Sequence, residues 1–411
     1  MKNLILAVFL APAAALAGGY VVPNVNARDV AMVGSPVAAQ DSAAATYQNP
    51  AALAKLEGLN VSADVSLIDL RTTWTDPTGI NSPVNTVPKA AFPPAIYAAY
   101  GFRLPEAANS MRAGVGVGFT VPGGGFVFWP GDWPGRNEIM TVDRKIFGIY
   151  ATAGLQVLPQ LRIGGGLIYY RTTEYLLQGL NFLGSTPGQI DLGTAGGAVS
   201  YDVSAEVTPV KDLPLTVALD YKHQAVQTLS GHAHGENVPL ALQPRLLDQA
   251  VTHVLTYPNQ LNIAVAYNVI QPLLLAFDWT LERQVVYVND TFTGDRGVTV
   301  VVPRNYTNDW TLRLGGEYQV LPLLRVRAGV EYDHAPQPSY SISPTLPTAN
   351  TWDVGLGAGY TVVPGLEINA GYFHAFYEKS TATGPESFPG TYDTNTNIYA
   401  LNITWKMGAS K

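Results

Sequence analysis

The stretch LRVRAGVEYD, residues 324–333, carries the pattern that decides the fold. Its odd and even positions differ in polarity: Leu324, Val326, Ala328, Val330 and Tyr332 alternate with Arg325, Arg327, Gly329, Glu331 and Asp333. Successive side chains of a β-strand point to opposite faces, so this stretch predicts a strand with one apolar face and one polar face. The segment 310–319 repeats the pattern.

Two kinds of protein show this alternation, and they differ in where the apolar face points. A soluble β-sandwich turns it toward its core, whereas a membrane barrel turns it toward lipid. Tyrosine and tryptophan recur near the strand ends and the second face is polar or glycine, which favours the barrel. Placing Arg325 and Arg327 on a lipid face would cost roughly 4–8 kcal/mol. We therefore predict that both arginines point into the lumen.

The same unit, an alternating segment followed by a short turn and a second alternating segment, recurs along the chain. Copies are 155–170, 206–221, 266–279, 317–333 and 359–373, and their turns contain proline. Segments of this kind predict about fourteen strands, near 58–69, 92–102, 111–121, 142–156, 161–175, 197–208, 214–227, 259–270, 273–287, 306–320, 323–334, 350–363, 366–378 and 395–407. The even number suits a closed bacterial barrel. The segments 122–141 and 228–258 are expected as long extracellular loops.

Composition excludes several other classes of protein. The formal net charge is −7, only 13% of residues are charged, and no basic cluster suggests binding to nucleic acid. The chain has no cysteine, and beyond its start no run approaches the ~20 apolar residues of a membrane-spanning helix. The fold class is therefore predicted to be all-β, a transmembrane antiparallel β-barrel.

The first seventeen residues have the organisation of a secretory signal. Lys2 is followed by the apolar run 4–10 and by Ala15-Leu16-Ala17, a small-x-small cleavage site. A transmembrane anchor is the alternative, but the apolar run is short for one. We expect a Sec-type signal peptide at 1–17, with cleavage near Ala17 and export to the bacterial outer membrane.

The stretch NVNARDVAMVGSPVAAQDSAAATYQNPAAL, residues 24–53, resembles the N-terminal hatch of the FadL and TodX family of outer-membrane channels for hydrophobic compounds. Within it, Asn26-Ala27-Arg28, Gly34, Ala38-Ala39, Asp41 and Asn49-Pro50-Ala51 fit the signature of that family. A second match is THVLTYPNQLNIAVAYNVIQPLLLAFDWT, residues 252–280. The resemblance covers essentially the whole mature chain.

The resemblance implies a division into a hatch at 18–56, folded into the lumen as a plug, and a barrel at 57–411. It also implies passive uptake of hydrophobic small molecules, foremost long-chain fatty acids, by extracellular capture, lumen binding, hatch movement and lateral exit into the bilayer. Aromatic hydrocarbons are the alternative substrate, and a non-transporting docking platform for secretion machinery is the alternative function. We expect a monomer in outer-membrane lipid, with no cofactor, no metal and no nucleic acid.

The motif Asn49-Pro50-Ala51 is the most specific part of the hatch resemblance. An asparagine side chain holds turns and proline fixes the backbone, so the chain can turn back and pack its small residues against the wall. An ordinary loop turn is the alternative interpretation.

The loop segment PRLLDQAVTHVL, residues 244–255, matches an amphipathic helix in its periodicity. Its apolar face would carry the candidates for an external ligand groove: Leu246, Leu247, Val251, Val254 and Leu255. Packing against neighbouring loops is the alternative role.

The third strand contains a proline and three glycines, which are Pro122, Gly123, Gly124 and Gly125. Proline removes a ladder donor and glycine weakens strand pairing, so these residues are candidates for a kink that opens the wall. Alternatively, Pro122 begins the extracellular loop.

Lumen arginines are candidates for contact with a ligand head group, and they are Arg162, Arg313, Arg325 and Arg327. Pairing with Glu317, Glu331 or Asp333 for structure is the alternative. His232 and His234 lie close in sequence, but a metal site needs further ligands, and we expect solvent exposure in a flexible loop. No Ser/His/Asp set falls on one strand face, so we predict that the protein is not an enzyme.

Overall fold

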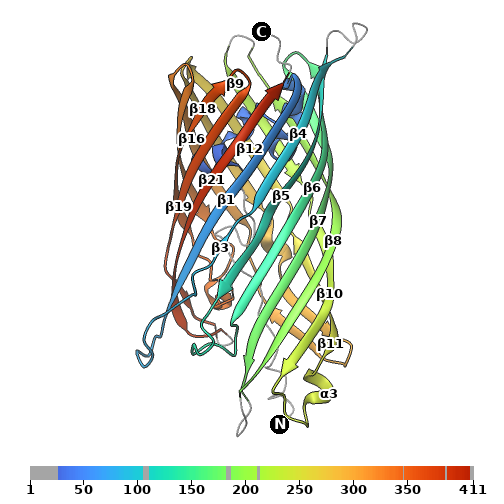
Figure 1. The fold of residues 1–411 in the computed structure, drawn as a ribbon, viewed down its shortest axis with the longest axis vertical. Helices are drawn as coiled ribbons and strands as arrows, with labels where there is room; N and C mark the ends of the chain where they lie inside the picture. Colours follow the sequence, from blue (N-terminus) through green and yellow to red (C-terminus); the bar gives the residue numbers. More distant parts are fainter. Residues whose placement is uncertain are drawn as a thin grey trace.

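The computed structural model describes residues 26–104, 111–181, 187–210, 213–345, 347–384 and 387–407. It shows a closed antiparallel β-barrel (Figure 1). The predicted signal peptide and the last residues after Met407 lie outside the described residues.

Fourteen principal strands form the wall. They are β1 (Gly58–Thr75), β4 (Pro94–Arg103), β5 (Arg112–Phe128), β6 (Thr141–Leu158), β7 (Leu161–Leu180), β8 (Gly188–Val207), β9 (Leu215–Lys222), β12 (Gln260–Ile270), β13 (Leu273–Glu282), β16 (Asp309–Leu321), β17 (Leu324–His334), β18 (Thr351–Val363), β19 (Leu366–Tyr377) and β21 (Gly390–Met407). The barrel closes where β1 pairs with β21, from Leu59–Met407 to Thr75–Thr391. The predicted strand count is confirmed, and the two segments with the weakest alternation, 92–102 and 142–156, are strands β4 and β6.

The wall has a turn end and a loop end. Short connections such as Pro159-Gln160 and Pro322-Leu323 define the turn end, uppermost in Figure 1, which is the periplasmic side in barrels of this kind. Toward the loop end, further segments continue the wall: β10 (Ala225–Glu236), β11 (Gln249–Tyr257), β14 (Asn289–Gly294) and β15 (Thr299–Pro303), with short β2 (Val84–Asn85), β3 (Ala90–Ala91) and β20 (Ser380–Ala382). The expectation of long loops is therefore wrong at 122–128, which belong to β5, and at 228–236 and 249–257, which belong to β10 and β11. Residues 129–140 do form a loop between β5 and β6.

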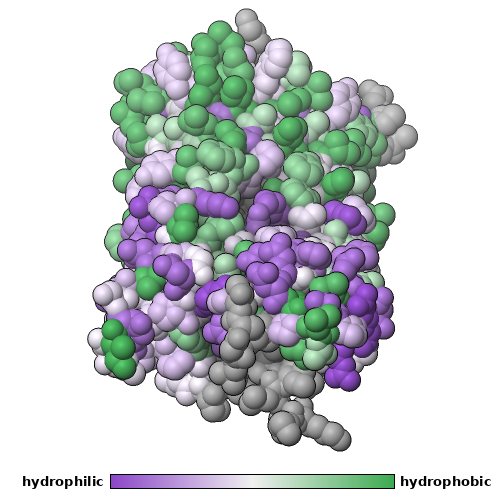
Figure 2. Space-filling view, turned by 60° about the horizontal axis from the view of Figure 1, so that its bottom comes forward, coloured by the Kyte–Doolittle hydropathy of each residue, from purple (hydrophilic) through white to green (hydrophobic). Residues whose placement is uncertain are grey.

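The two faces of the wall differ in polarity as the alternation predicts. On β1 the inward residues Asn60, Ser62 and Asp64 are buried, whereas Leu59 and Val65 are exposed on the outer face. Figure 2 shows hydrophobic residues dominating the upper wall and hydrophilic residues the lower part, nearer the loop end. An apolar outer band with a polar interior is typical of a membrane-spanning barrel.

The N-terminal segment 26–56 packs inside the barrel toward the turn end (Figure 1, blue). It consists of α1 (Ala27–Ala31), η2 (Pro36–Ala39), α2 (Ala45–Gln48) and η3 (Pro50–Lys55). Asn26 caps α1, since its side-chain oxygen accepts a hydrogen bond from the Asp29 amide at 3.0 Å. The other helical turns among the described residues are α3 (Gln243–Leu246), η5 (Gln284–Val286) and η6 (Ser339–Ser341). None of the described helices is both long enough and apolar enough to cross a membrane.

Candidate functional site

The segment Asn49-Pro50-Ala51 is fully buried against the inner face of β8. The Asn49 side-chain amide donates to a carboxylate oxygen of Glu206 at 3.0 Å and to the Val37 carbonyl at 3.2 Å. The Ala51 amide donates to the Ser204 hydroxyl at 2.8 Å. Pro50 begins η3, where its missing amide hydrogen leaves no helical bond unmade. The chain therefore turns at Asn49 and is held to the wall on both sides of the turn.

Glycines of the wall let the backbone of the N-terminal segment 26–56 approach the strands closely. A Cβ atom on Gly164 of β7 would lie 2.3 Å from the Ala51 amide nitrogen, and one on Gly154 of β6 would lie 2.3 Å from the Pro50 carbonyl oxygen. Gly114 of β5 bears the same relation to the Leu53 carbonyl. No side chain larger than hydrogen fits at such distances from a backbone. These strand glycines thus form the surface on which η3 rests.

All four lumen arginines predicted to meet a ligand head group have carboxylate partners. Arg162 pairs with Glu206 at 2.8 Å, and Arg325 pairs with Glu367 at 2.7 Å. Arg313 pairs with Asp278 at 2.8 Å and Glu331 at 3.1 Å, and Arg327 pairs with Glu317 at 2.6 Å and Glu367 at 3.0 Å. Arg325 and Arg327 do lie on the lumen side, as the alternation predicts. Their role in ligand contact stays a prediction.

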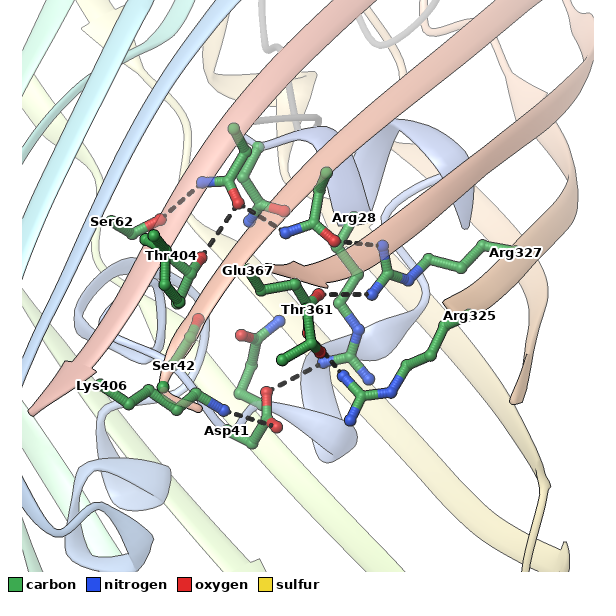
Figure 3. A pocket seen from close by; sticks show the side chains of 16 residues that line it. Arg28, Asp41, Ser42, Ser62, Arg325, Arg327, Thr361, Glu367, Thr404 and Lys406 are labelled. Atoms are coloured by element: carbon green, nitrogen blue, oxygen red, sulfur yellow. Dashed lines mark hydrogen bonds and ion pairs between the residues drawn. The ribbon is translucent and has the colours of Figure 1, made fainter. Parts of the chain in front are cut away.

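A cavity of about 210 Å³ lies between the N-terminal segment and β17–β21 at the turn end. Figure 3 shows Arg325 and Arg327 reaching from the wall toward Arg28 and Glu367. Nearby, Asp41 pairs with Lys406 at 3.0 Å and with Arg28 at 3.4 Å. Burial opposes it, but Lys406 and Arg28 together hold the pKa of Asp41 well below its usual range. Four cations, Arg28, Arg325, Arg327 and Lys406, line this cavity with two carboxylates, Asp41 and Glu367. Each of the four pairs with a carboxylate of the protein, which suits a structural contact between the N-terminal segment and the wall.

Asp29 is a buried carboxyl of the N-terminal segment, with Asn26 as its close hydrogen-bond partner. Burial raises the pKa of Asp29 to about 8, and hydrogen bonding to Gln48 opposes this rise. We therefore expect deprotonation of Asp29 to weaken the packing of α1 against the wall.

The third strand, β5, contains the predicted irregularity. Its pairing with β6 shifts by one residue between Thr120 and Gly123, which is a β-bulge at Val121-Pro122. Gly124 has a φ of 141°, a conformation that glycine adopts at low cost. The strand continues to Phe128, so the alternative that Pro122 begins the loop is wrong.

Beyond the bulge, β5 no longer pairs with β4, the strand on its other side. Its ladder with β4 runs from Arg103–Arg112 to Ile96–Phe119 and goes no further. Nearer the loop end, the Val87 amide donates to the Phe128 carbonyl at 2.6 Å. We call the interval between 87–94 and 120–128 the wall gap.

A cavity of about 330 Å³ lies at the wall gap, and residues of both faces of the wall line it. Phe147 on its border belongs to the outward face of β6, whereas Ile68 and Arg144 are inward-facing and buried. Phe92, Phe126 and Phe128 are among the other lining residues. Residues from the outer and the inner face of the wall therefore border the same cavity. The role of Pro122, Gly123, Gly124 and Gly125 in opening it for a ligand is untested.

The amphipathic helix predicted over 244–255 is wrong. Only Gln243–Leu246 is helical, and Gln249–Tyr257 forms strand β11. Val251 and Leu255 consequently face inward and are buried, as is Leu246, whereas Val254 is 49% exposed and Leu247 is 37% exposed. The predicted groove residues do not share one face, and the external groove remains a prediction.

Two lumen networks escaped the sequence analysis. Four tyrosine rings form a chain from the hatch to the bulge: Tyr47 contacts Tyr150 at 5.2 Å between ring centroids, Tyr150 contacts Tyr170 at 6.5 Å, and Tyr170 contacts Tyr257 at 4.7 Å. The Tyr257 hydroxyl donates to the Pro122 carbonyl at 3.0 Å. The inward position of Tyr150 and Tyr170 in alternating strands was the available signal for this network.

The second network is ionic and lies nearer the loop end. The His253 ring nitrogens lie 3.0 Å from Glu174 and 3.1 Å from Asp290. Glu174 also binds Arg144, and Asp290 pairs with Arg304 at 2.7 Å. Its members come from β6, β7, β11, β14 and the segment after β15, so only the barrel brings them together.

His232 and His234 lie on β10, and the expectation of a flexible loop is wrong for them. Both are exposed, and His232 has Asp248 at 3.8 Å. Within the described part of the chain, no group of three or more histidine, aspartate or glutamate side chains is placed to hold a metal ion.

A closed barrel with an apolar outer band, a polar lumen and a packed N-terminal segment defines an outer-membrane channel protein. The chain belongs to the family of outer membrane protein transport proteins (OMPP1/FadL/TodX), whose family model matches residues 8–407. This is a family of outer-membrane channels for hydrophobic compounds. Among curated proteins, no match to this chain was found.

Solved structures support the fold. The chain is similar to the crystal structure of a Pseudomonas aeruginosa FadL homologue, with 19% identity, a TM-score of 0.83, and coverage of 94% of this chain and 99% of the other. The Pseudomonas putida toluene transporter TodX gives 14% identity, a TM-score of 0.72 and coverage of 96% and 100%. The Ralstonia pickettii toluene transporter TbuX gives 16% identity, a TM-score of 0.67, and coverage of 93% of this chain and 100% of the other. At these identities the likeness concerns the fold.

Proposed function

We propose that this protein is a passive uptake channel for hydrophobic compounds, foremost long-chain fatty acids. A ligand is captured outside, binds in the lumen, and leaves sideways through the wall gap into the bilayer. Residues 18–56 act as a hatch and residues 57–411 as the barrel, after removal of residues 1–17. The working unit is a monomer in outer-membrane lipid.

The observation that carries this proposal is the cavity of the wall gap. Its lining includes inward-facing Ile68 and outward-facing Phe147, so it offers apolar surface at both faces of the wall. Burial is worth about 0.8 kcal/mol per methylene, so a long acyl chain gains on the order of 10 kcal/mol by remaining in apolar surroundings. A sideways route spares such a chain the transfer into periplasmic water.

The hatch is the second part of the proposed pathway. Asn49, Pro50 and Ala51 hold it against β8, and the four-tyrosine chain extends from its Tyr47 toward the bulge. Its movement would open the lumen toward the turn end.

Aromatic hydrocarbons are the second candidate substrate, because the names of two similar structures describe toluene transporters. A docking platform for secretion machinery is a candidate of another class. It predicts a stably bound partner protein and a lumen without ligand after purification.

Uptake of labelled oleate and labelled toluene by cells with and without the gene tests the proposal. We expect faster oleate uptake when the gene is present. Faster uptake of toluene alone would assign the aromatic substrate, and no change for either compound would reject transport.

A further inference from the structure

The outer rim of the wall gap carries two lysines, Lys89 and Lys145. Lys89 lies immediately before β3, and its Nζ atom lies 3.6 Å from the centroid of the Phe128 ring. Lys145 is exposed on the outward face of β6 and pairs with Asp143 at 2.7 Å. Both lysines line the same cavity as Phe92, Phe126 and Phe147. An apolar slot thus has cations at its mouth.

This mouth lies where the outer surface changes from apolar to polar. Along the outward face of β6, Ile149 and Phe147 are followed by Lys145 and Asp143. In a membrane barrel such a change marks the boundary between hydrocarbon and head groups. A ligand in the slot would therefore have its polar end at the interface and its apolar end in the cavity.

Cations outnumber carboxylates among the residues that line the slot. The lining contains three cations, Arg144, Lys145 and Lys89, and one carboxylate, Asp143. Arg144 is buried and binds Glu174, and Lys145 binds Asp143. Within the described ranges, Lys89 has no carboxylate within ion-pair distance, and its amine rests on an aromatic face. Lys89 is therefore the cation best placed to accept an anionic group.

We infer that the rim of the wall gap binds the carboxylate of a single-chain anionic amphiphile whose tail occupies the apolar cavity. This inference rests on the proposed uptake function, and it assigns the carboxylate to Lys89 and Lys145. The arginines predicted from the sequence all pair with carboxylates of the protein, as Lys145 does with Asp143, whereas Lys89 forms no such pair within the described ranges.

The size of the cavity selects against other occupants. About 330 Å³ lies at the lower limit for sites that hold a small ligand, so one chain fits and a lipid with several chains does not. A neutral arene would fill the apolar part but leave Lys89 without an anionic partner. The phosphates of outer-leaflet lipid are the competing anions, and the experiment must separate them.

Photolabelling in reconstituted bilayers tests the site directly. The probes are a dodecanoic acid and a dodecanol, each carrying the same diazirine on the chain, and peptides around Phe92, Phe128 and Phe147 are quantified by mass spectrometry. An exposed ion pair contributes up to about 1 kcal/mol, which is about fivefold in binding. We expect the acid to label these peptides about three- to tenfold more than the alcohol.

Variants assign this preference to the lysines. Lys89→Met combined with Lys145→Met keeps the aliphatic stems, and we expect acid labelling to fall about three- to tenfold while alcohol labelling is unchanged. Lys89→Arg should retain the preference. Arg296→Met is the matched control, because Arg296 lies in the turn between β14 and β15, outside the gap. Equal labelling by acid and alcohol, or no effect of the double variant, would overturn the inference.

Bilayers with and without lipopolysaccharide separate the two sources of anion. Acid labelling in both supports the amphiphile, whereas labelling that disappears when lipopolysaccharide is present would assign the rim to lipid and overturn the inference. Uptake in cells is scored separately. Preferential labelling without uptake would reject the transport function alone, and uptake without preferential labelling would reject the lysine site alone.

Discussion

Two regions of the barrel are built from opposite kinds of residue. One is the wall gap, and the other is the contact of η3 of the hatch with the strand glycines, which we call the hatch contact. At the hatch contact, Ala51 and Pro50 rest on Gly164 and Gly154, and backbone lies against backbone. At the wall gap, phenylalanines, prolines and lysines surround a cavity of about 330 Å³. Close packing of small residues leaves no room for a guest, whereas large side chains around an interrupted ladder leave space for one.

Strand β5 takes part in both regions, and the bulge divides it. Before the bulge, Gly114 lies under Leu53 of the hatch. After it, Gly123, Gly124 and Gly125 border the gap. Glycine therefore serves two purposes in one strand: close approach of another backbone in the first half, and an irregular backbone in the second.

Gly164→Ala should produce the largest effect on the hatch contact. Its Cβ would lie 2.3 Å from the Ala51 amide nitrogen, so the hatch must shift. Overpacking of this kind costs about 1–3 kcal/mol. The chain contains no cysteine, so a single Ala52→Cys can be labelled cleanly with a maleimide. We expect labelling to accelerate by about ten- to a hundredfold.

Gly193→Ala is the control for this prediction, because open space surrounds the position of its Cβ. It should leave Ala52→Cys labelling unchanged. Equal labelling rates in the Gly164 and Gly193 variants would show that the contact is looser than the geometry indicates.

Raising the pH should loosen the seating of α1. Because burial raises the pKa of Asp29 to about 8 from an ordinary value of 3.8, the seated hatch binds more protons than the displaced hatch. Seating is therefore strongest below about pH 4 and weakens as the pH rises through about 8. We expect labelling of Ala31→Cys to rise at least about tenfold between pH 5 and pH 9, beyond the intrinsic effect of pH on the thiol.

Asp29→Asn should abolish that dependence, and a free thiol measured in parallel corrects for reagent reactivity. If Ala31→Cys labelling still rises with pH in Asp29→Asn, the pH dependence belongs to another group. The wall gap, which lacks this carboxyl, should not change its photolabelling with this substitution.

The sequence predicted the strands well because alternation is a local property. The prediction failed at 249–257, where the apolar residues fit the period of a helix and the period of a strand equally well. This segment forms a strand because it pairs with β10 and β14. The His253–Glu174 contact joins residues 79 positions apart. Such a contact depends on the register of strands around the whole barrel, which no local pattern records. The close fit of strand glycines to the hatch escaped prediction for the same reason.

Asn49→Ala should weaken the hatch contact by a smaller amount than a clash does. The substitution removes the hydrogen bonds to Glu206 and Val37, but Lys55 and Arg162 continue to pair with Glu206 at 2.9 and 2.8 Å. The free energy that holds the hatch against the wall should therefore fall by about 1 kcal/mol, so Ala52→Cys labelling should rise about fivefold. Asn49→Asp should raise the Ala52→Cys labelling rate further, because it places a second carboxylate against Glu206. A faster rate in Asn49→Ala than in Asn49→Asp would contradict the assigned donor role.

Tyr257→Phe should have no effect on the hatch, and it tests whether the two regions are independent. The substitution removes the hydrogen bond to the Pro122 carbonyl but preserves the ring contact with Tyr170. A single neutral hydrogen bond contributes about 0.5–1.5 kcal/mol, so photolabelling at the wall gap should change by about two- to tenfold. Labelling of Ala52→Cys in the hatch should stay constant, because the tyrosine rings between the regions remain packed.

Tyr318→Phe, on the exposed outer face of β16, is the control for the loss of a hydroxyl and should change neither readout. If Tyr257→Phe instead changes hatch labelling in proportion to gap labelling, the four-tyrosine chain transmits the state of the bulge to the hatch. The close contact and the open gap would then be two parts of one device, because the free energy of the hydroxyl bond would appear at both ends of the chain.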